Sequence, residues 1–146
     1  MASSAAQAEV VAANAADVAR ARAEGASDST VDRLTLDERR VAAITAALRT
    51  AAALPDPLGR TLEGRILPNG LRLERRTVPL GVLGIIYEAR PNVTVDAAGL
   101  CLMAGNAVLL RGGSDALESN GALVEAMHRG LDAVGLPCSL IYLVRD

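Results

Sequence analysis

Apolar positions in the second half of the chain alternate between short, strand-like runs and longer, helix-like ones. Residues 82–87 form a short apolar run with β-branched and aromatic members, and residues 107–110 form another. Such runs are typical of strands that are buried on both faces of a sheet. Between them, residues 93–104 are apolar on nearly every side, which predicts a buried helix that ends at Gly105. Because parallel strands need a crossover, the pattern predicts a parallel sheet.

The same alternation continues towards the end of the chain. A helix that opens at Ser114 or Asp115 carries apolar residues four apart as far as Leu131, and Gly135 follows it. Residues 139–144 form a third apolar strand. A parallel sheet has helices on both faces, and only part of that set is present here. We therefore expect an α/β, three-layer fold that contains the first half of a Rossmann-like domain.

The N-terminal third of the chain, residues 1–54, has the pattern of a helical segment. Its alanine-rich first helix carries only a weak apolar stripe, with Val11 and Val18 seven residues apart. A later helix begins at Thr35, which has capping-box spacing with Glu38, and its apolar residues recur at steps of three and four. We expect the whole segment to serve as scaffold.

Residues 55–78 change to a two-residue period and predict a β-hairpin. Asn69-Gly70 stands between two extended stretches, and Asn-Gly is the strongest short-range hairpin signal because both residues tolerate positive φ. The second stretch carries a charged ribbon of Arg72, Glu74, Arg75 and Arg76. A charged ribbon is usually a solvated face. Alternatively, the hairpin is an arm that pairs with a partner chain or with another domain.

Composition narrows the class of protein. Hydrophobic residues make up 51% of the 146 residues and aromatics 1%, so the core consists of aliphatic side chains. The net charge of -2 provides no positive field that would recruit nucleic acid. No apolar stretch is long enough for a membrane span, and the N-terminus lacks the regions of a signal peptide. The two cysteines, far apart in sequence, indicate neither a disulfide framework nor a metal site. A reduced, cytoplasmic setting fits.

Two turns, residues 88–92 and 111–114, follow predicted strands at their carboxyl ends, where parallel sheets bind ligands. The second turn consists of Arg111, Gly112, Gly113 and Ser114. Its arginine supplies a cation, its glycines let the backbone approach a ligand, and a helix N-terminus lies behind it, an arrangement that suits an anion. The alternative is an ordinary turn with glycine at positive φ and Ser114 as the helix N-cap.

Three stretches closely resemble the γ-glutamyl phosphate reductases, a branch of the aldehyde dehydrogenase superfamily. They are LPNGLRLERRTVPLG at 67–81, YEARPNVTVDAA at 87–98 and LLRGGSDA at 109–116. The resemblance implies an aldehyde-dehydrogenase-like fold, with residues 79–146 as part of an NADP-binding domain. Family chains are much longer, and this chain resembles their first part, without the catalytic domain.

The resemblance also implies an activity. The family reduces γ-glutamyl phosphate (L-glutamate 5-phosphate) to L-glutamate 5-semialdehyde with NADPH, in proline biosynthesis. Its nucleophilic cysteine forms a thioester and lies in the second domain, so this chain alone is expected to be inactive. The alternative is a non-catalytic module that binds nucleotide or forms a homo-oligomer through the hairpin arm.

Site residues follow from the same resemblance. Asn92 matches the superfamily asparagine that offers its side-chain amide to the developing oxyanion, although an ordinary N-cap is the simpler interpretation of the residue. Arg111 would fork onto the 2′-phosphate of NADP(H), with Ser114 adding a hydroxyl. Arg90 is a candidate contact for the acidic substrate, although a structural ion pair, with Glu88 or with the second domain, is the preferred interpretation.

Other reactive side chains have structural interpretations. Asp96 is expected in the first turn of its helix, where a negative charge favours the helix dipole. Cys101 lies within an apolar helix and is expected to be an inert, buried thiol. Cys138 follows a proline with no base near it, so neither cysteine matches the family nucleophile. The single histidine, His128, excludes a catalytic triad or metal cluster built from histidines within this chain.

Overall fold

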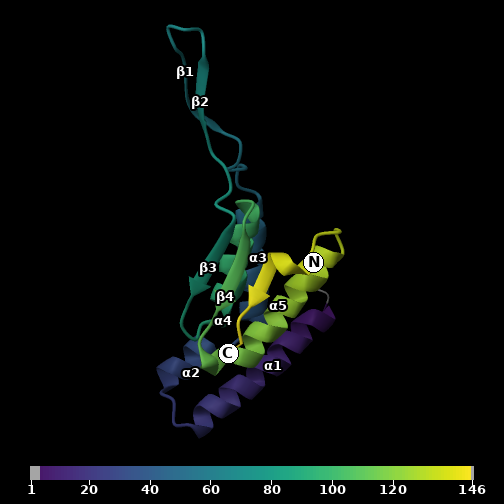
Figure 1. The fold of residues 1–146 in the computed structure, drawn as a ribbon. Coiled ribbons are helices and arrows are strands. Elements are labelled where there is room, and N and C mark those ends of the chain that lie inside the picture. The colour runs from purple at the N-terminus through teal and green to yellow at the C-terminus, as the bar shows by residue number, and fades with distance from the viewer. Residues whose placement is uncertain (1–3, 146) are drawn as a thin grey trace.

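The structure, a computed structural model, describes residues 4–145 and contains a parallel sheet, packed helices and a hairpin that projects away from them (Figure 1). The elements are α1 (Ser4–Ala23), α2 (Asp28–Leu34), α3 (Glu38–Ala52), β1 (Thr61–Ile66), β2 (Arg72–Arg76), β3 (Val82–Ile86), α4 (Pro91–Met103), β4 (Ala107–Arg111), the short 3-10 helix η1 (Ser114–Ala116), α5 (Leu117–Asp132), a second 3-10 helix η2 (Cys138–Leu140) and β5 (Ile141–Leu143).

The sheet has the predicted parallel topology. Its strand order is β3-β4-β5, with α4 and α5 as the two crossovers. Val82 pairs with Ala107 at one end of the β3–β4 ladder and Ile86 with Arg111 at the other. The core lies between the strands and the crossover helices, where Val108, Leu110 and Ile141 pack with residues of α4 and α5. The fold is α/β, with helices and strands alternating along residues 82–143, as predicted.

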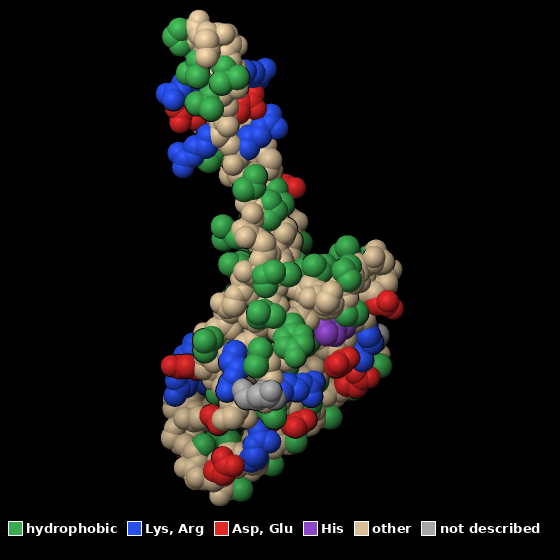
Figure 2. Space-filling view, viewed as in Figure 1, with side chains coloured by type: hydrophobic (Ala, Val, Ile, Leu, Met, Phe, Trp, Pro, Cys, Tyr) green, Lys and Arg blue, Asp and Glu red, His purple; other side chains and the backbone are tan. Residues whose placement is uncertain are grey.

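Burial on both faces of the strands, however, was a wrong prediction. Val82 is 63% exposed and Ile86 86%, while Leu109 and Tyr142 on the neighbouring strands are 44% and 58% exposed. Alternate side chains of a strand point to opposite faces. Within residues 4–145, helices cover one face of the sheet, and the other face presents this apolar set to solvent. Figure 2 shows hydrophobic side chains gathered over the strands on that face.

A second layer of helices lies behind the crossover helices. α1 packs against α5, and α3 packs against α4 (Figure 1). Gly99 of α4 permits the close approach of α3, because a Cβ there would clash with Cδ1 of Leu48. The stripe predicted on α3 is confirmed, since Val41 is buried and Ile44 and Leu48 pack against the same cluster. The N-terminal helices are therefore joined to the sheet domain rather than separate from it.

Two predictions about these N-terminal helices were wrong. Thr35 does not cap α3: it is the C-cap of α2, and the N-cap of α3 is Asp37, whose Oδ1 accepts from the Arg40 amide at 2.7 Å. The buried face of α1 is also not the one that the two valines marked. Val11 and Val18 are half-buried, and the fully buried residues are Ala6, Val10, Asn14, Asp17 and Ala21. Four of these five residues are polar or alanine, so a search for large apolar residues does not find this face.

The predicted hairpin is confirmed. β1 and β2 pair antiparallel, from Thr61 opposite Arg76 to Ile66 opposite Arg72, with a register shift between Thr61 and Glu63. Gly70 in the connecting loop adopts φ 83°, whereas Asn69 does not adopt positive φ. Every residue of β1 is exposed, so the hairpin makes its contacts almost entirely with itself.

The part of the chain that the structure describes, residues 4–145, has no feature of a membrane span or of a metal centre. No helix there is both long and apolar enough to cross a bilayer. No cluster of three or more His, Cys, Asp or Glu side chains there is arranged to hold a metal ion.

The one-sided sheet predicts different stability effects for two adjacent leucines of β4. Leu110 is 0% exposed and Leu109 is 44% exposed. We expect Leu110→Ala to lower the free energy of unfolding by about 2–5 kcal/mol, because it leaves a core cavity. Leu109→Ala should lower it by less than about 1 kcal/mol. Urea unfolding followed by circular dichroism measures both, and equal losses would show that the open face is covered in solution.

Candidate functional site

The two turns singled out in the sequence lie against each other at one rim of the sheet. The Tyr87 amide donates to the Arg111 carbonyl at 3.0 Å, which extends the β3–β4 ladder into the turns. Further on, a Cβ at Gly113 would lie 3.1 Å from the backbone nitrogen of Ala89. The expectation that both turns occupy the carboxyl ends of the strands is therefore confirmed, and they form a single surface.

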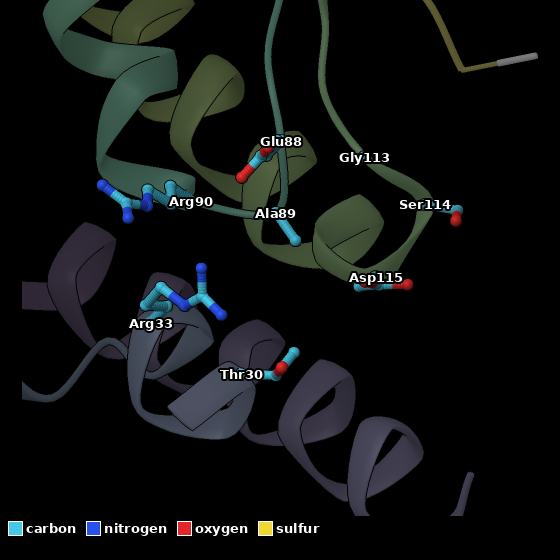
Figure 3. Close-up of a pocket in the computed structure, with 8 residues that line it drawn as sticks. All are labelled: Thr30, Arg33, Glu88, Ala89, Arg90, Gly113, Ser114 and Asp115. Carbon is cyan, nitrogen blue, oxygen red and sulfur yellow. The ribbon is translucent and has the colours of Figure 1, made fainter. Parts of the chain in front are cut away.

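A cleft of about 350 Å³ opens where these turns face helix α2 (Figure 3). It is lined by Glu88, Ala89 and Arg90 of the first turn, by Gly113, Ser114 and Asp115 of the second, and by Thr30 and Arg33 of α2. Sequence reasoning missed the α2 wall, because a seven-residue amphipathic turn far from the sheet in sequence carries no signal of its position. The cleft thus combines three segments of the chain.

Two arginines dominate the cleft wall that lies between α2 and the first turn. Arg33 and Arg90 both line the cleft, and in Figure 3 their guanidinium groups point in different directions rather than towards one another. Nε of Arg33 donates to the Ser29 carbonyl at 3.2 Å, which leaves its terminal nitrogens for other acceptors. Within residues 4–145 neither arginine forms an ion pair, so the preferred Glu88–Arg90 pair is not found. The lining also carries the carboxylates of Glu88 and Asp115, so an anion would bind by direct contact with a guanidinium group rather than through a net positive charge.

Arg111 lies beside the cleft rather than in its lining. Its side chain is exposed, and Nη1 donates to the carbonyl of Gly112 at 2.9 Å. The guanidinium therefore folds back over its own turn and keeps further N–H groups for a ligand. Ser114, by contrast, does line the cleft. The structure brings together Arg90, Gly113 and Ser114 of the predicted site residues and places Arg111 at their edge.

The alternative interpretation of the second turn is wrong in both of its parts. Neither Gly112 nor Gly113 has positive φ, and Gly113 is extended with φ −63° and ψ 150°. Ser114 is not a helix N-cap, because the N-cap of η1 is Gly113 and the N-cap of α5 is Ala116. Gly112 is required for packing instead: a Cβ there would clash with Nδ2 of Asn120 and lie 3.1 Å from the Tyr87 ring.

A buried hydrogen-bonded chain supports both turns from below. The Thr94 hydroxyl donates to Oδ1 of Asn120 at 2.8 Å and accepts from the Tyr87 hydroxyl at 2.7 Å. This chain links the end of β3, the first turn of α4 and the start of α5. Burial raises the pKa of Tyr87 above its ordinary 10.0, an effect that the Thr94 hydrogen bond partly offsets. The phenol therefore stays protonated at neutral pH and keeps its role as a donor.

Asn92 occupies the second position of α4, after Pro91, and Arg90 is the N-cap. The N-cap interpretation of Asn92 is therefore wrong. Its Nδ2 donates to Oδ2 of Asp96 at 3.3 Å, and Asn92 does not line the cleft. Asp96 itself lies in the second turn of the helix rather than the first. The oxyanion role of Asn92 stays a prediction; the bond to Asp96 uses one of the two N–H groups of its amide.

Cys101 has the buried setting that was expected of an inert thiol. Cys101 is 5% exposed within the core, and burial raises the pKa of its thiol, which disfavours the nucleophilic thiolate. The Cys138 thiol donates to the His128 carbonyl at 3.6 Å. A nitrogen of the His128 ring lies 2.9 Å from the Ile141 carbonyl, and among the described residues the ring forms no hydrogen bond with either sulfur.

The packing of the second turn predicts opposite effects for two glycine-to-alanine substitutions. Gly112→Ala should lower the free energy of unfolding by about 1–3 kcal/mol, because Asn120 is held by Thr94 and cannot move aside cheaply. Gly130→Ala, in the interior of α5 with nothing near the new Cβ, should raise it by up to about 1 kcal/mol through helix propensity. Chemical denaturation compares them, and a Gly112→Ala variant as stable as the original chain would contradict the packing argument.

No family model matches the chain. The γ-glutamyl phosphate reductase of Kineococcus radiotolerans is 57% identical over 132 residues, which are 90% of this chain and 31% of that protein. The γ-glutamyl phosphate reductase of Xanthomonas oryzae pv. oryzae is 52% identical over 137 residues, 94% of this chain and 33% of that protein. The chain spans about a third of the length of these curated relatives.

Solved structures agree. The γ-glutamyl phosphate reductase of Thermotoga maritima superposes with a TM-score of 0.92 at 43% identity, over 94% of this chain and 33% of that one. The Saccharomyces cerevisiae enzyme gives 0.82 at 29% identity, over 94% and 36%. A Rhodopseudomonas palustris propionaldehyde dehydrogenase gives 0.53 at 19% identity, over 97% and 37%, which shows a shared fold. Sequence and fold together identify the chain as a homologue of the γ-glutamyl phosphate reductases over about a third of their length.

Proposed function

We propose that this chain supplies part of the binding site for the NADPH-dependent reduction of L-glutamate 5-phosphate to L-glutamate 5-semialdehyde, a step of proline biosynthesis. One observation carries the proposal: two turns at the carboxyl rim of a parallel sheet meet in a cleft with two unpaired guanidinium groups, in a chain homologous to enzymes named for that substrate. A rim of this kind is where open α/β sheets bind their ligands.

The residues of the rim fit a phosphorylated nicotinamide cofactor. Arg111 offers N–H groups beside the exposed turn, and Ser114 offers a hydroxyl within the cleft. We assign Arg111 to the 2′-phosphate, because a guanidinium can hold a phosphate through two parallel hydrogen bonds. Gly112 and Gly113 shape the turn that carries both groups. The cofactor, when bound, supplies the hydride for the reduction.

The acidic substrate is assigned to the two arginines of the cleft. Arg90, a predicted substrate contact, is joined there by Arg33, and both can bind a carboxylate or a phosphate. Acyl transfer from phosphate needs a thiolate, and neither the buried Cys101 nor the hydrogen-bonded Cys138 is suited to provide one. The chain alone is therefore expected to bind ligands without turning them over.

Cofactor binding can be tested by titrating the chain with NADPH and with NADH. NADPH should bind more tightly, and Arg111→Ala should weaken NADPH binding by about 10–100-fold, the cost of losing a charged hydrogen-bonded pair. NADH binding should change little, because it lacks the 2′-phosphate. Isothermal calorimetry provides both affinities, with Arg65→Ala in the distant hairpin as the matched control.

Equal affinity for the two nucleotides, unaffected by Arg111→Ala, would rule out this assignment of the turn. In the same mixtures, γ-glutamyl phosphate should cause no loss of NADPH absorbance. Steady oxidation of NADPH by the purified chain would overturn the expectation that its cysteines are not catalytic.

A second candidate function, assembly into a homo-oligomer through the hairpin, rests on a separate observation. The hairpin stands clear of the other elements (Figures 1 and 2). Leu62, Ile66, Leu71 and Leu73 on it are between 43% and 75% exposed. Each strand pairs only with the other, so both outer edges are free among the described residues. An isolated two-stranded hairpin is marginally stable, and a free edge is a template for another strand.

Sedimentation velocity tests this candidate. The chain should sediment as an oligomer whose proportion rises with concentration, and Ile66→Glu combined with Leu73→Glu should shift it to monomer by placing charges on the hairpin. Leu136→Glu, at an exposed position away from the hairpin, is the matched control and should change nothing. A chain that is monomeric throughout, or a double variant that still associates, would exclude the hairpin as the contact.

A further inference from the structure

One face of α1 carries three polar residues at intervals of three, in a helix otherwise made largely of alanine. They are Asn14, Asp17 and Arg20. Asn14 is 2% exposed and Asp17 is 0% exposed, so two of them are buried where a helix face normally carries aliphatic side chains. Buried polar groups are costly unless they are hydrogen-bonded, and here every one is used.

Asp17 caps the start of α5 from outside that helix. Its Oδ2 accepts from the Ser119 amide at 2.8 Å and from the Ser119 hydroxyl at 2.6 Å, and Oδ1 accepts from the Glu118 amide at 3.3 Å. No side chain within α5 or η1 performs this role. Two of the free N–H groups at the start of α5, directly after the cleft turn, are therefore satisfied by α1.

Arg20 completes the contact with the turn itself. Nη2 donates to Oδ1 of Asp17 at 2.5 Å and to the carbonyls of Ser114 and Asp115 at 3.3 Å each. Ser114 and Asp115 both line the cleft, whereas Arg20 and Asp17 do not. The pair thus contacts the turn from behind, through backbone atoms that a ligand in the cleft does not need.

Asn14 links α2, which forms the opposite wall of the cleft, to Ser119 at the start of α5. Its Nδ2 donates to the Leu34 carbonyl at 2.8 Å and to the Ser119 hydroxyl at 2.9 Å, and its Oδ1 accepts from the Leu36 amide at 2.6 Å. Leu34 is the last residue of α2, the helix that carries Thr30 and Arg33. Side chains on one face of α1 therefore form hydrogen bonds with both walls of the cleft.

We infer that Asp17 and Arg20 are positioning residues for the cleft turn: they hold the Ser114–Glu118 backbone in the conformation that binds a phosphorylated nucleotide. The inference rests on the proposed nucleotide-binding function. A turn that is already ordered loses less conformational entropy when a ligand binds, so loosening it weakens affinity without removing any ligand contact. α1 thereby contributes to affinity through the turn, although it is distant from the ligand.

The test compares Arg20→Gln with Arg129→Gln. Arg129 also connects α5 to α1, through a 2.6 Å ion pair with Glu9, but lies near the other end of α5. For each variant, calorimetry gives NADPH affinity, denaturation gives stability, and amide hydrogen exchange reports on residues 114–119. Arg20→Met, which keeps the aliphatic stem of the side chain and removes its charge, repeats the measurement and serves if the glutamine variant does not fold.

Arg20→Gln should weaken NADPH binding by about 3–10-fold, the loss of roughly one hydrogen bond, and should speed exchange in residues 114–119. Arg129→Gln should change neither. Unchanged NADPH affinity in a folded Arg20 variant would overturn the inference while leaving the proposed function intact. If the unaltered chain binds no NADPH, the proposed function fails and the inference fails with it.

Discussion

Parallel pairing between β3 and β4 is the constraint on which the site depends. Because the two strands run in the same direction, residues that follow them in sequence must leave the sheet at the same rim. The Tyr87–Arg111 hydrogen bond extends that pairing by one step, and contact between Ala89 and Gly113 then keeps the turns together. Two segments more than twenty residues apart in sequence become one surface through backbone geometry, before any side chain is considered.

Glycine in the second turn follows from this closeness. Gly112 and Gly113 adopt backbone conformations that any residue could adopt, so conformational freedom does not explain them. Their missing side chains leave room for the Tyr87 ring, for Asn120 and for the backbone of Ala89. Ser114, the residue that follows them, is exposed and lines the cleft. The two glycines therefore allow this turn to pack closely against its neighbours.

Much of the fold could be predicted from sequence because it depends on local periodicity. The strands, the crossover helices and the hairpin follow from the spacing of apolar residues and from Asn69-Gly70. The predictions that failed concern features that depend on residues far apart in the sequence. Val82 and Ile86 have the composition of a buried strand, yet exposure depends on which elements cover the sheet face. Likewise, the cleft wall formed by Arg33 is set by how α2 packs, which no local pattern around Arg33 encodes.

The N-terminal helix shows why such failures matter for function. Alanine-rich sequence predicts a helix but does not predict its buried face, and the valines that formed the apparent stripe are half-buried. Its buried face is instead marked by residues that bond to α2 and α5, Asn14 and Asp17. Apolar packing tolerates small shifts between helices, whereas a buried carboxylate with several donors accepts a narrow range of positions. A polar contact at this point therefore sets the relative position of the cleft walls more closely than a valine could.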